Sequence, residues 1–191
     1  RLGIMQNYAS HWDDAAPELA PGETLSYGPA PQQTLEFRPA RGLADKARAP
    51  LILFVHGGGW SRGSKGNATG RWKAAHFPQI GIAFVSIDYR LVPQARVEDE
   101  AADVAHALAK VIAESERLGI DRHRIVLMGH SAGARQSEAL AKALEDGGSK
   151  VELAGFPGQG LIGHMEINRR LGDPDYPVTK TVDAWLKRVV G

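Results

Sequence analysis

The feature that most constrains the fold of this chain is the pentapeptide Gly129-His130-Ser131-Ala132-Gly133, a G-x-S-x-G motif. The apolar run Ile125–Met128 precedes it, and an alanine-rich segment follows it. A short, continuous apolar run is typical of a strand buried on both faces, and alanine favours helix. The order of strand, motif and helix predicts a sharp turn that raises the Ser131 hydroxyl above the carboxyl end of a sheet.

Other segments repeat this alternation of strands and helices. Apolar residues at helical spacing between Glu98 and Leu118, and again in Gln136–Glu145, predict helices. An amphipathic pattern predicts a last helix over 182–189. Further buried strands are expected at Leu51–Val55, Ala83–Ile87 and Val151–Phe156. The chain is therefore expected to form an α/β fold, with a mostly parallel sheet and helices on both faces.

The 191 residues correspond to one domain, and residues 1–33 form a turn-rich arm packed on it. Two short strands are expected in this region, at Thr24–Tyr27 and Thr34–Arg38. The loop 61–70 contains three glycines and is expected to be flexible.

Charge and cysteine content exclude several classes of function. Lys and Arg number 23 and Asp and Glu number 22, without a block of like charge, so neither nucleic acid nor a membrane surface is indicated as a partner. The chain has no cysteine, which excludes disulfides, thiolate metal sites and cysteine nucleophiles. No apolar run approaches the ~20 residues of a membrane span, and the first residues lack a signal-peptide core. A cytoplasmic location is the default expectation.

A glycine run follows the strand at Leu51–Val55, in the sequence His56-Gly57-Gly58-Gly59-Trp60. Three successive glycines fit neither strand nor helix well, but they suit a loop whose amides approach another group closely. The backbone N–H groups of Gly58, Gly59 and Ala132 are therefore candidates for an oxyanion hole beside Ser131. A phosphate-binding loop is not indicated, because the chain lacks the G-K-[ST] sequence.

A serine hydroxyl needs a neighbouring base to become a good nucleophile, and histidine is the usual choice. Among the seven histidines, His164 is the one that follows Ser131 and the last expected strand. Loops after strands carry the sites of open α/β sheets, so His164 is the predicted catalytic base. We expect His56 to shape the glycine loop and His130 to point away from the serine pocket. The others are expected to have structural or solvated roles: His11, His76, His106 and His123.

These motifs together resemble the α/β-hydrolase superfamily. The resemblance rests on four elements of the sequence: His56–Trp60, Asp88–Pro93, Gly129–Gly133 and His164. More narrowly, the chain is similar to the esterase/lipase group with an H-G-G-G loop, which includes kynurenine formamidase-like enzymes. The resemblance implies Ser131 as nucleophile, His164 as base, and oxyanion amides at Gly58, Gly59 and Ala132.

The acid of the expected catalytic triad has no counterpart in this sequence. Only 32 residues separate Ser131 from His164, whereas a further strand and its crossover need ~30 more. In similar proteins a long segment separates the positions of Ala134 and Arg135, and the acid lies in it. Three explanations remain open: the sequence omits that segment, a real deletion leaves a serine–histidine dyad, or another carboxylate substitutes. The substitutes considered are Glu145, Asp146, Asp173 and Asp175.

The sequence therefore predicts a serine hydrolase that cleaves carboxylic esters of small acyl or aryl groups through an acyl-enzyme. The alternatives are an arylformamidase and a catalytically inactive hydrolase-fold protein that binds a ligand. No metal or organic cofactor is implied. The expected partner is a small-molecule ester or formamide, and the sequence does not specify an oligomeric state.

Overall fold

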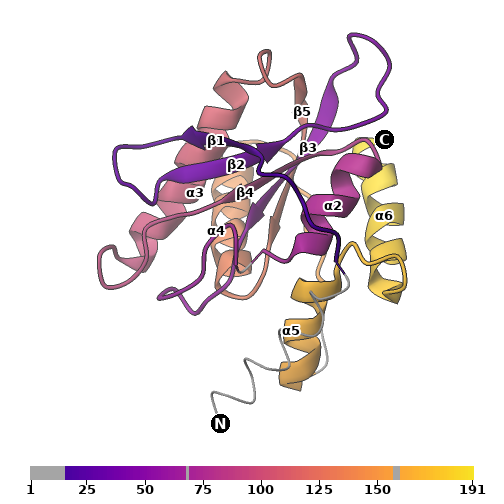
Figure 1. Ribbon diagram of the computed structural model, residues 1–191. Coiled ribbons are helices and arrows are strands. Elements are labelled where there is room, and N and C mark those ends of the chain that lie inside the picture. The colour runs from indigo at the N-terminus through magenta and orange to yellow at the C-terminus, as the bar shows by residue number, and fades with distance from the viewer. Residues whose placement is uncertain (1–15, 68, 157–159) are drawn as a thin grey trace.

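The apolar segments form a mixed five-stranded sheet of order β1-β2-β4-β3-β5 in a computed structural model of the chain (Figure 1). The structure describes residues 16–67, 69–156 and 160–191. Strand β3 pairs in parallel with β4 and β5, while β2 pairs antiparallel with β1 and β4. The bounds are β1 Glu23–Ser26, β2 Thr34–Arg38, β3 Ala49–Val55, β4 Ala83–Ile87 and β5 Ile120–Gly129.

Helices cover both faces of the sheet, and β3 is therefore buried along its whole length. Successive side chains of a strand point to opposite faces. On one face Leu53 belongs to an apolar cluster with Val104 and Ala107 of α3. On the other face Phe54 clusters with Phe77 of α2 and Leu186 of α6. The helices are α2 Arg71–Gln79, α3 Val97–Ala113, α4 Ala132–Asp146, α5 Gly160–Arg170 and α6 Pro177–Val190.

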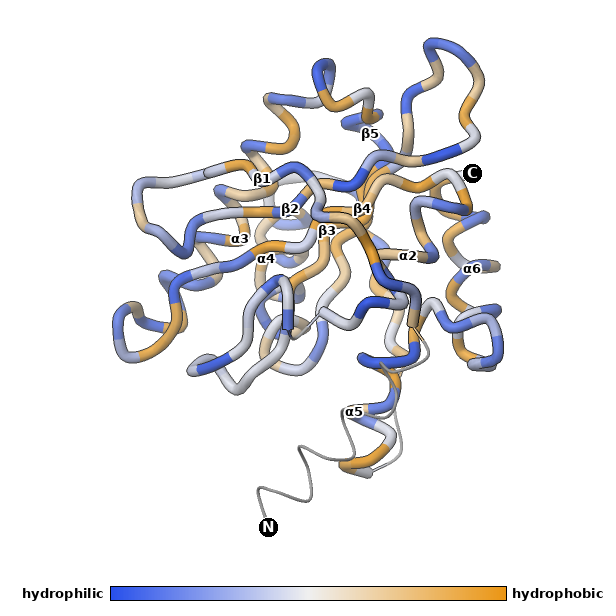
Figure 2. Tube along the Cα trace, in the orientation of Figure 1, coloured by the Kyte–Doolittle hydropathy of each residue, from blue (hydrophilic) through white to orange (hydrophobic). Residues whose placement is uncertain are grey.

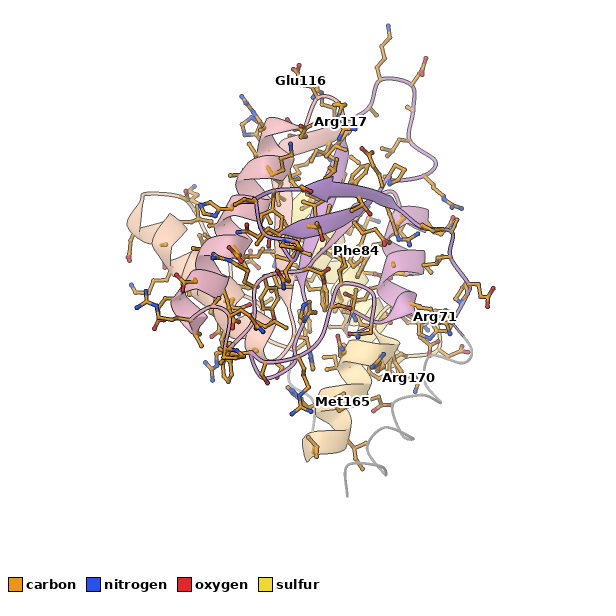
Figure 3. The ribbon with its side chains drawn as sticks, turned by 60° about the vertical axis from the view of Figure 1, so that its left-hand side comes forward. Arg71, Phe84, Glu116, Arg117, Met165 and Arg170 are labelled. Atoms are coloured by element: carbon orange, nitrogen blue, oxygen red, sulfur yellow. The ribbon has the colours of Figure 1, made fainter. Side chains whose placement is uncertain are left out.

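The figures show the same layering. Apolar residues concentrate along the central strands in Figure 2. Phe84, on β4, lies inside the molecule in Figure 3, whereas Glu116 and Arg117 lie at the periphery beyond the end of α3. The predicted mostly parallel sheet with helices on both faces is confirmed. None of the described helices is long and apolar enough to cross a bilayer.

Most predicted elements are confirmed with shifted ends. The helix expected over 98–118 ends at Ala113, and the one expected over 136–145 begins at Ala132. Residues 1–15 of the expected N-terminal arm lie outside the described residues.

The strand predicted at Val151–Phe156 is wrong, because this segment is irregular in the structure. A strand needs a hydrogen-bonding neighbour, and the described sheet ends at β5 without adding this segment. Its Glu152 instead accepts hydrogen bonds from Trp185 (2.9 Å) and Arg188 on α6. Apolar sequence alone therefore does not make a strand where pairing is missing.

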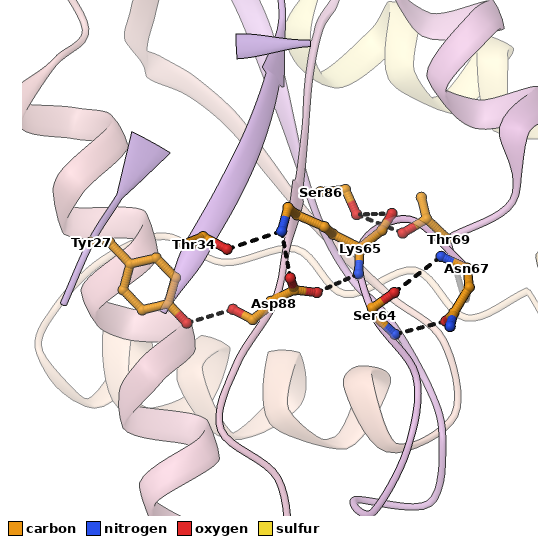
Figure 4. Close-up of polar contacts among 8 residues, drawn as sticks. All are labelled: Tyr27, Thr34, Ser64, Lys65, Asn67, Thr69, Ser86 and Asp88. Atoms are coloured by element: carbon orange, nitrogen blue, oxygen red, sulfur yellow. Dashed lines mark hydrogen bonds and ion pairs between the residues drawn. The ribbon is translucent and has the colours of Figure 1, made fainter. Parts of the chain in front are cut away.

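Polar contacts tie the described residues of the 61–70 loop, which was expected to be flexible, to the sheet (Figure 4). Lys65 donates from its backbone N–H and its ammonium to Asp88, both at 2.5 Å. The same ammonium donates to Thr34 on β2 at 2.9 Å. Tyr27 donates to the Asp88 carbonyl, and Ser86 donates to the Lys65 carbonyl. The glycine-rich loop is thereby fixed between β2 and the end of β4.

A second polar cluster surrounds Asp103, which is fully buried on α3. Arg90 donates two side-chain hydrogen bonds to it, at 2.9 and 2.7 Å, and one from its backbone at 3.0 Å. Gln33 donates a fourth at 2.7 Å. Burial raises the pKa of Asp103, but the hydrogen bonds from Arg90 outweigh it and hold the pKa below its usual value. Asp103 is therefore a buried, ionised carboxylate that joins α3 to the segments after β1 and β4.

Replacing Asp103 with Asn should lower the free energy of unfolding by about 2–3 kcal/mol, because the Arg90 guanidinium then lacks its counter-charge. Urea unfolding at pH 7 measures the change. Glu116→Gln is the control, because Glu116 is 88% exposed in its pair with Arg48 and should shift stability by less than about 0.5 kcal/mol. Equal effects of the two variants would contradict this account.

Candidate active site

The turn between β5 and α4 has the strained backbone expected of a nucleophile elbow. Ser131 has φ 57° and ψ −118°, a conformation that non-glycine residues seldom adopt. A Cβ atom on Gly129 would lie 2.4 Å from the Gly133 carbonyl oxygen. A Cβ on Gly133 would lie 2.2 Å from the Val55 carbonyl oxygen. Both glycines are therefore sterically required for helix α4 to begin against the end of β3.

The glycine run lies directly beside this turn. A Cβ on Gly57 would lie 3.0 Å from the Cβ of Ser131. Gly58 and Gly59 have φ of 145° and 60°, and a Cβ on Gly58 would lie 1.8 Å from the Arg62 carbonyl oxygen. The loop thus folds back on itself, in a conformation that glycine adopts readily at position 58. This brings the segment with the candidate oxyanion amides close to the elbow.

His56 is buried beneath the loop and does not resemble a catalytic base. Its ring stacks on Tyr89 with centroids 4.5 Å apart, and the Tyr89 hydroxyl donates to the His56 carbonyl at 2.7 Å. Burial lowers the pKa of His56 and raises that of Tyr89, so both side chains are neutral at pH 7. The pair supports the glycine loop from below.

His164 lies on helix α5, and the prediction that it follows a strand in a loop is wrong. Its ring packs on the ring of His130 with centroids 4.4 Å apart. Nε2 of His130 donates to the His164 carbonyl at 2.7 Å. Burial lowers the pKa of His130 to about 4, so this imidazole is neutral and able to donate from one nitrogen. His130 therefore holds α5 against the elbow, a contact that no sequence motif indicated.

Ser131, His130 and His164 line one groove of about 1050 Å³. Its walls include β5, part of α4 and the irregular segment 149–156. Within the described chain, neither the Ser131 hydroxyl nor the His164 ring forms a hydrogen bond. The structure thus brings nucleophile and base candidates to one groove without joining them.

None of the four carboxylates considered as the triad acid hydrogen-bonds to His164 in the described structure. Asp146 accepts from Lys142 at 3.3 Å, and Asp173 accepts from Arg170 at 2.9 Å. Glu145 and Asp175 are exposed. The described residues also contain no cluster of three or more His, Asp or Glu side chains placed to hold a metal ion.

Comparison with known proteins gives relatives that are named as esterases. Esterase LipC of Mycobacterium tuberculosis is 32% identical over 127 residues, which is 66% of this chain and 31% of LipC. Esterase LipI of the same organism is 34% identical over 138 residues, covering 69% of this chain and 41% of LipI. The chain thus spans less than half the length of these relatives.

Solved structures show the same fold. The apo form of Thermogutta terrifontis esterase 2 has a TM-score of 0.58 and 28% identity, covering 65% of this chain and 47% of that structure. A bacterial heroin esterase has a TM-score of 0.62 at 24% identity, covering 78% and 47%. These neighbours confirm the α/β-hydrolase fold expected from the sequence motifs.

The family model described as BD-FAE matches residues 41–153, more than half of the chain. This range begins before β3 and extends beyond α4, so it contains the glycine loop and the Ser131 turn. With the strained elbow and the fold of its neighbours, this match establishes that the chain belongs to the BD-FAE family of the α/β-hydrolase class.

Proposed function

We propose that this chain is a serine hydrolase that cleaves carboxylic esters of small acyl or aryl groups through an acyl-enzyme. The observation that carries the proposal is the strained Ser131 backbone at the first turn of α4, next to a glycine loop. Strain of about 1–3 kcal/mol at one residue persists where the surrounding structure fixes it, and it clusters at functional sites. The esterase names of the relatives support the same class of substrate.

In the proposed mechanism the Ser131 oxygen attacks the ester carbonyl carbon while His164 takes the hydroxyl proton. The carbonyl oxygen becomes an oxyanion, which accepts hydrogen bonds from the amides of Gly58, Gly59 and Ala132. His164 then gives its proton to the leaving alkoxide, and the acyl group stays on Ser131. Water, deprotonated by His164, attacks the acyl-enzyme, and His164 returns that proton to the Ser131 oxygen as the acid is released.

This mechanism requires His164 to approach Ser131 more closely than in the present arrangement. Catalytic hydrogen bonds often tighten when substrate binds, so an open pair is compatible with activity. An imidazole without a hydrogen-bonded acid is less well oriented, because the acid of a triad fixes the histidine tautomer and stabilises the imidazolium. We therefore expect slow turnover compared with a complete triad.

The open Ser131–His164 pair also favours a second candidate, a hydrolase-fold protein that binds ligands without turning them over. A fluorophosphonate probe separates the two candidates, because it reacts with an activated serine and leaves an inert one unmodified. An arylformamidase uses the same machinery on a different carbonyl. Parallel assays with p-nitrophenyl acetate and an N-aryl formamide distinguish these substrates.

Replacing Ser131 with Ala should abolish fluorophosphonate labelling and lower p-nitrophenyl acetate hydrolysis by at least about a thousandfold, because the nucleophile is lost. Mass spectrometry of the labelled protein and initial rates measure the two effects. Ser137→Ala is the matched control, since Ser137 lies on the same helix and its hydroxyl donates to the Gly133 carbonyl at 2.8 Å. Labelling that survives in the Ser131 variant would reject the assignment.

Ala substitutions at Gly58 and Gly59 should have different effects. At Gly58 the new Cβ meets the Arg62 carbonyl at 1.8 Å, so the loop must rearrange and the labelling rate should fall by about 10²-fold or more. At Gly59 no atom lies within 4 Å of the added Cβ, and φ of 60° is accessible to alanine at modest cost. The labelling rate of the Gly59 variant should therefore fall much less than that of the Gly58 variant. Similar labelling rates in both variants would contradict an oxyanion role for this loop.

Replacing His164 with Gln should lower the labelling rate about 10²–10⁴-fold, because no base then accepts the serine proton. His123→Gln is the control, since His123 is an exposed residue of β5 that lines the same groove. A His164 variant that reacts as fast as the parent would assign the base elsewhere.

A further inference from the structure

Two buried carboxyl groups lie three residues apart on α3, in different environments. Glu100 and Asp103 both have 0% exposure. Asp103 faces the Arg90 guanidinium and accepts four hydrogen bonds. Glu100 has no cationic partner among the described residues, and its side-chain donor is the amide of Gln136 on α4. The negative charge of an ionised Asp103 is therefore balanced by Arg90, whereas an ionised Glu100 has no cation to balance it among the described residues.

The side chains of Glu100 and Gln136 have one donor too few for their acceptor atoms when Glu100 is ionised. Gln136 Nε2 donates to Glu100 Oε2 at 2.5 Å. The two other polar atoms of this pair, Glu100 Oε1 and Gln136 Oε1, are buried and have no hydrogen-bond partner among the described residues. Both are acceptors when the acid is ionised. A single proton on Glu100 Oε1 turns that oxygen into a donor, and Gln136 Oε1 is the acceptor of the same pair that has no donor.

We propose that Glu100 is a neutral carboxylic acid in the folded protein, its Oε1–H donating to Gln136 Oε1, so that a proton-dependent pair joins α3 to the Ser131-bearing helix α4. Gln136 is the fifth residue of α4, so the pair lies about one and a half turns from the proposed nucleophile. Glu100 is thus a positioning residue. Its effect on reactivity rests on the proposed function, but its protonation does not.

The surroundings of Glu100 favour the neutral form. Burial raises the pKa of this carboxyl to about 7, against smaller opposing effects of the hydrogen bonds from Gln136 and the Val92 backbone. The negative charge of Asp103 acts in the same direction as burial. Tyr89, the other titratable side chain facing Glu100, is neutral because burial raises its pKa.

The direction of the pH dependence follows from this raised pKa. Between the ordinary carboxyl pKa of about 4.3 and about 7, the folded state holds a proton that the unfolded state has released. The stabilisation is complete below that window, decreases as pH rises through it, and is lost above about 7. Above that pH the two Oε1 atoms are both acceptors, and the link between α3 and α4 weakens.

Urea unfolding from pH 5 to 8.5 tests the proposal in the full chain and in Glu100→Gln. A glutamine offers the same donor and acceptor without a titrating proton, so the variant should match the parent most closely at pH 5 and be the more stable of the two near neutral pH. The unfolding constant of the parent, divided by that of the variant, should rise up to about tenfold per pH unit until about pH 7 and then level off. A ratio that stays constant across this range would overturn the proposal.

Glu116→Gln is the control, because Glu116 is 88% exposed in its pair with Arg48 and is not among the groups that act on Glu100. It should leave the pH slope of the parent unchanged. If Glu100→Gln fails to fold, ¹³C NMR of the parent with labelled glutamate side chains replaces it. One carboxyl carbon titrating near pH 7 supports the proposal, and all carboxyls titrating below about pH 5 would overturn it.

A fluorophosphonate assay tests the effect on reactivity separately. The labelling rate at Ser131 should be lower at pH 8.5, relative to Glu100→Gln, than at pH 6. Equal pH profiles in the two proteins would overturn the positioning role. Absence of labelling in both would reject the proposed function, while the unfolding data would still decide the protonation of Glu100.

Discussion

The close approach of helix α4 to the end of β3 is the constraint on which the rest of the structure depends. Gly133 lies so near β3 that a single added carbon would meet the Val55 carbonyl at 2.2 Å. This approach forces the abrupt turn at Ser131 and places it beside the loop that continues from β3. The order of the strands, the strained turn at Ser131 and the glycine loop therefore depend on one another sterically.

The same constraint explains why one half of the site is well formed and the other is open. Ser131 and the glycine loop directly follow β5 and β3, two adjacent parallel strands, and β3 is buried along its whole length. His164 belongs to α5, which reaches the elbow through His130 rather than through a paired strand. The segment before it, 151–156, has strand-like sequence but no neighbour, because the described sheet ends at β5. The base therefore lacks the rigid support that the nucleophile has.

Local sequence was sufficient to predict the elements whose burial or steric requirements are local. The residue types of the apolar runs in β3 and β4, and of the glycines at 129 and 133, are sufficient to indicate their environment. The run in β5 forms the predicted strand but is only partly buried, because β5 is at the edge of the described sheet. The prediction of a strand at Val151–Phe156 was wrong because strand formation also requires a neighbouring strand to pair with, which the sequence of the segment does not reveal. The tethering of the 61–70 loop was missed for the same reason: Lys65 meets Asp88 and Thr34 only after β2 and β4 are assembled. The position of His164 was predicted by chain order, which does not specify a helix or a contact with His130.

Charge states illustrate the same limit at the scale of single atoms. In sequence, Glu100 and Asp103 are two acids in one turn of an amphipathic helix, and nothing in their order distinguishes them. In the fold, Arg90 reaches Asp103 with a planar, two-pronged donor, whereas Gln136 reaches Glu100 with one amide. Burial opposes ionisation in both places, and only a compensating cation reverses the outcome. Two identical functional groups therefore stabilise the same helix by opposite means, one through its charge and the other through its proton. Because α3 packs against α4, both effects reach the helix that carries Ser131.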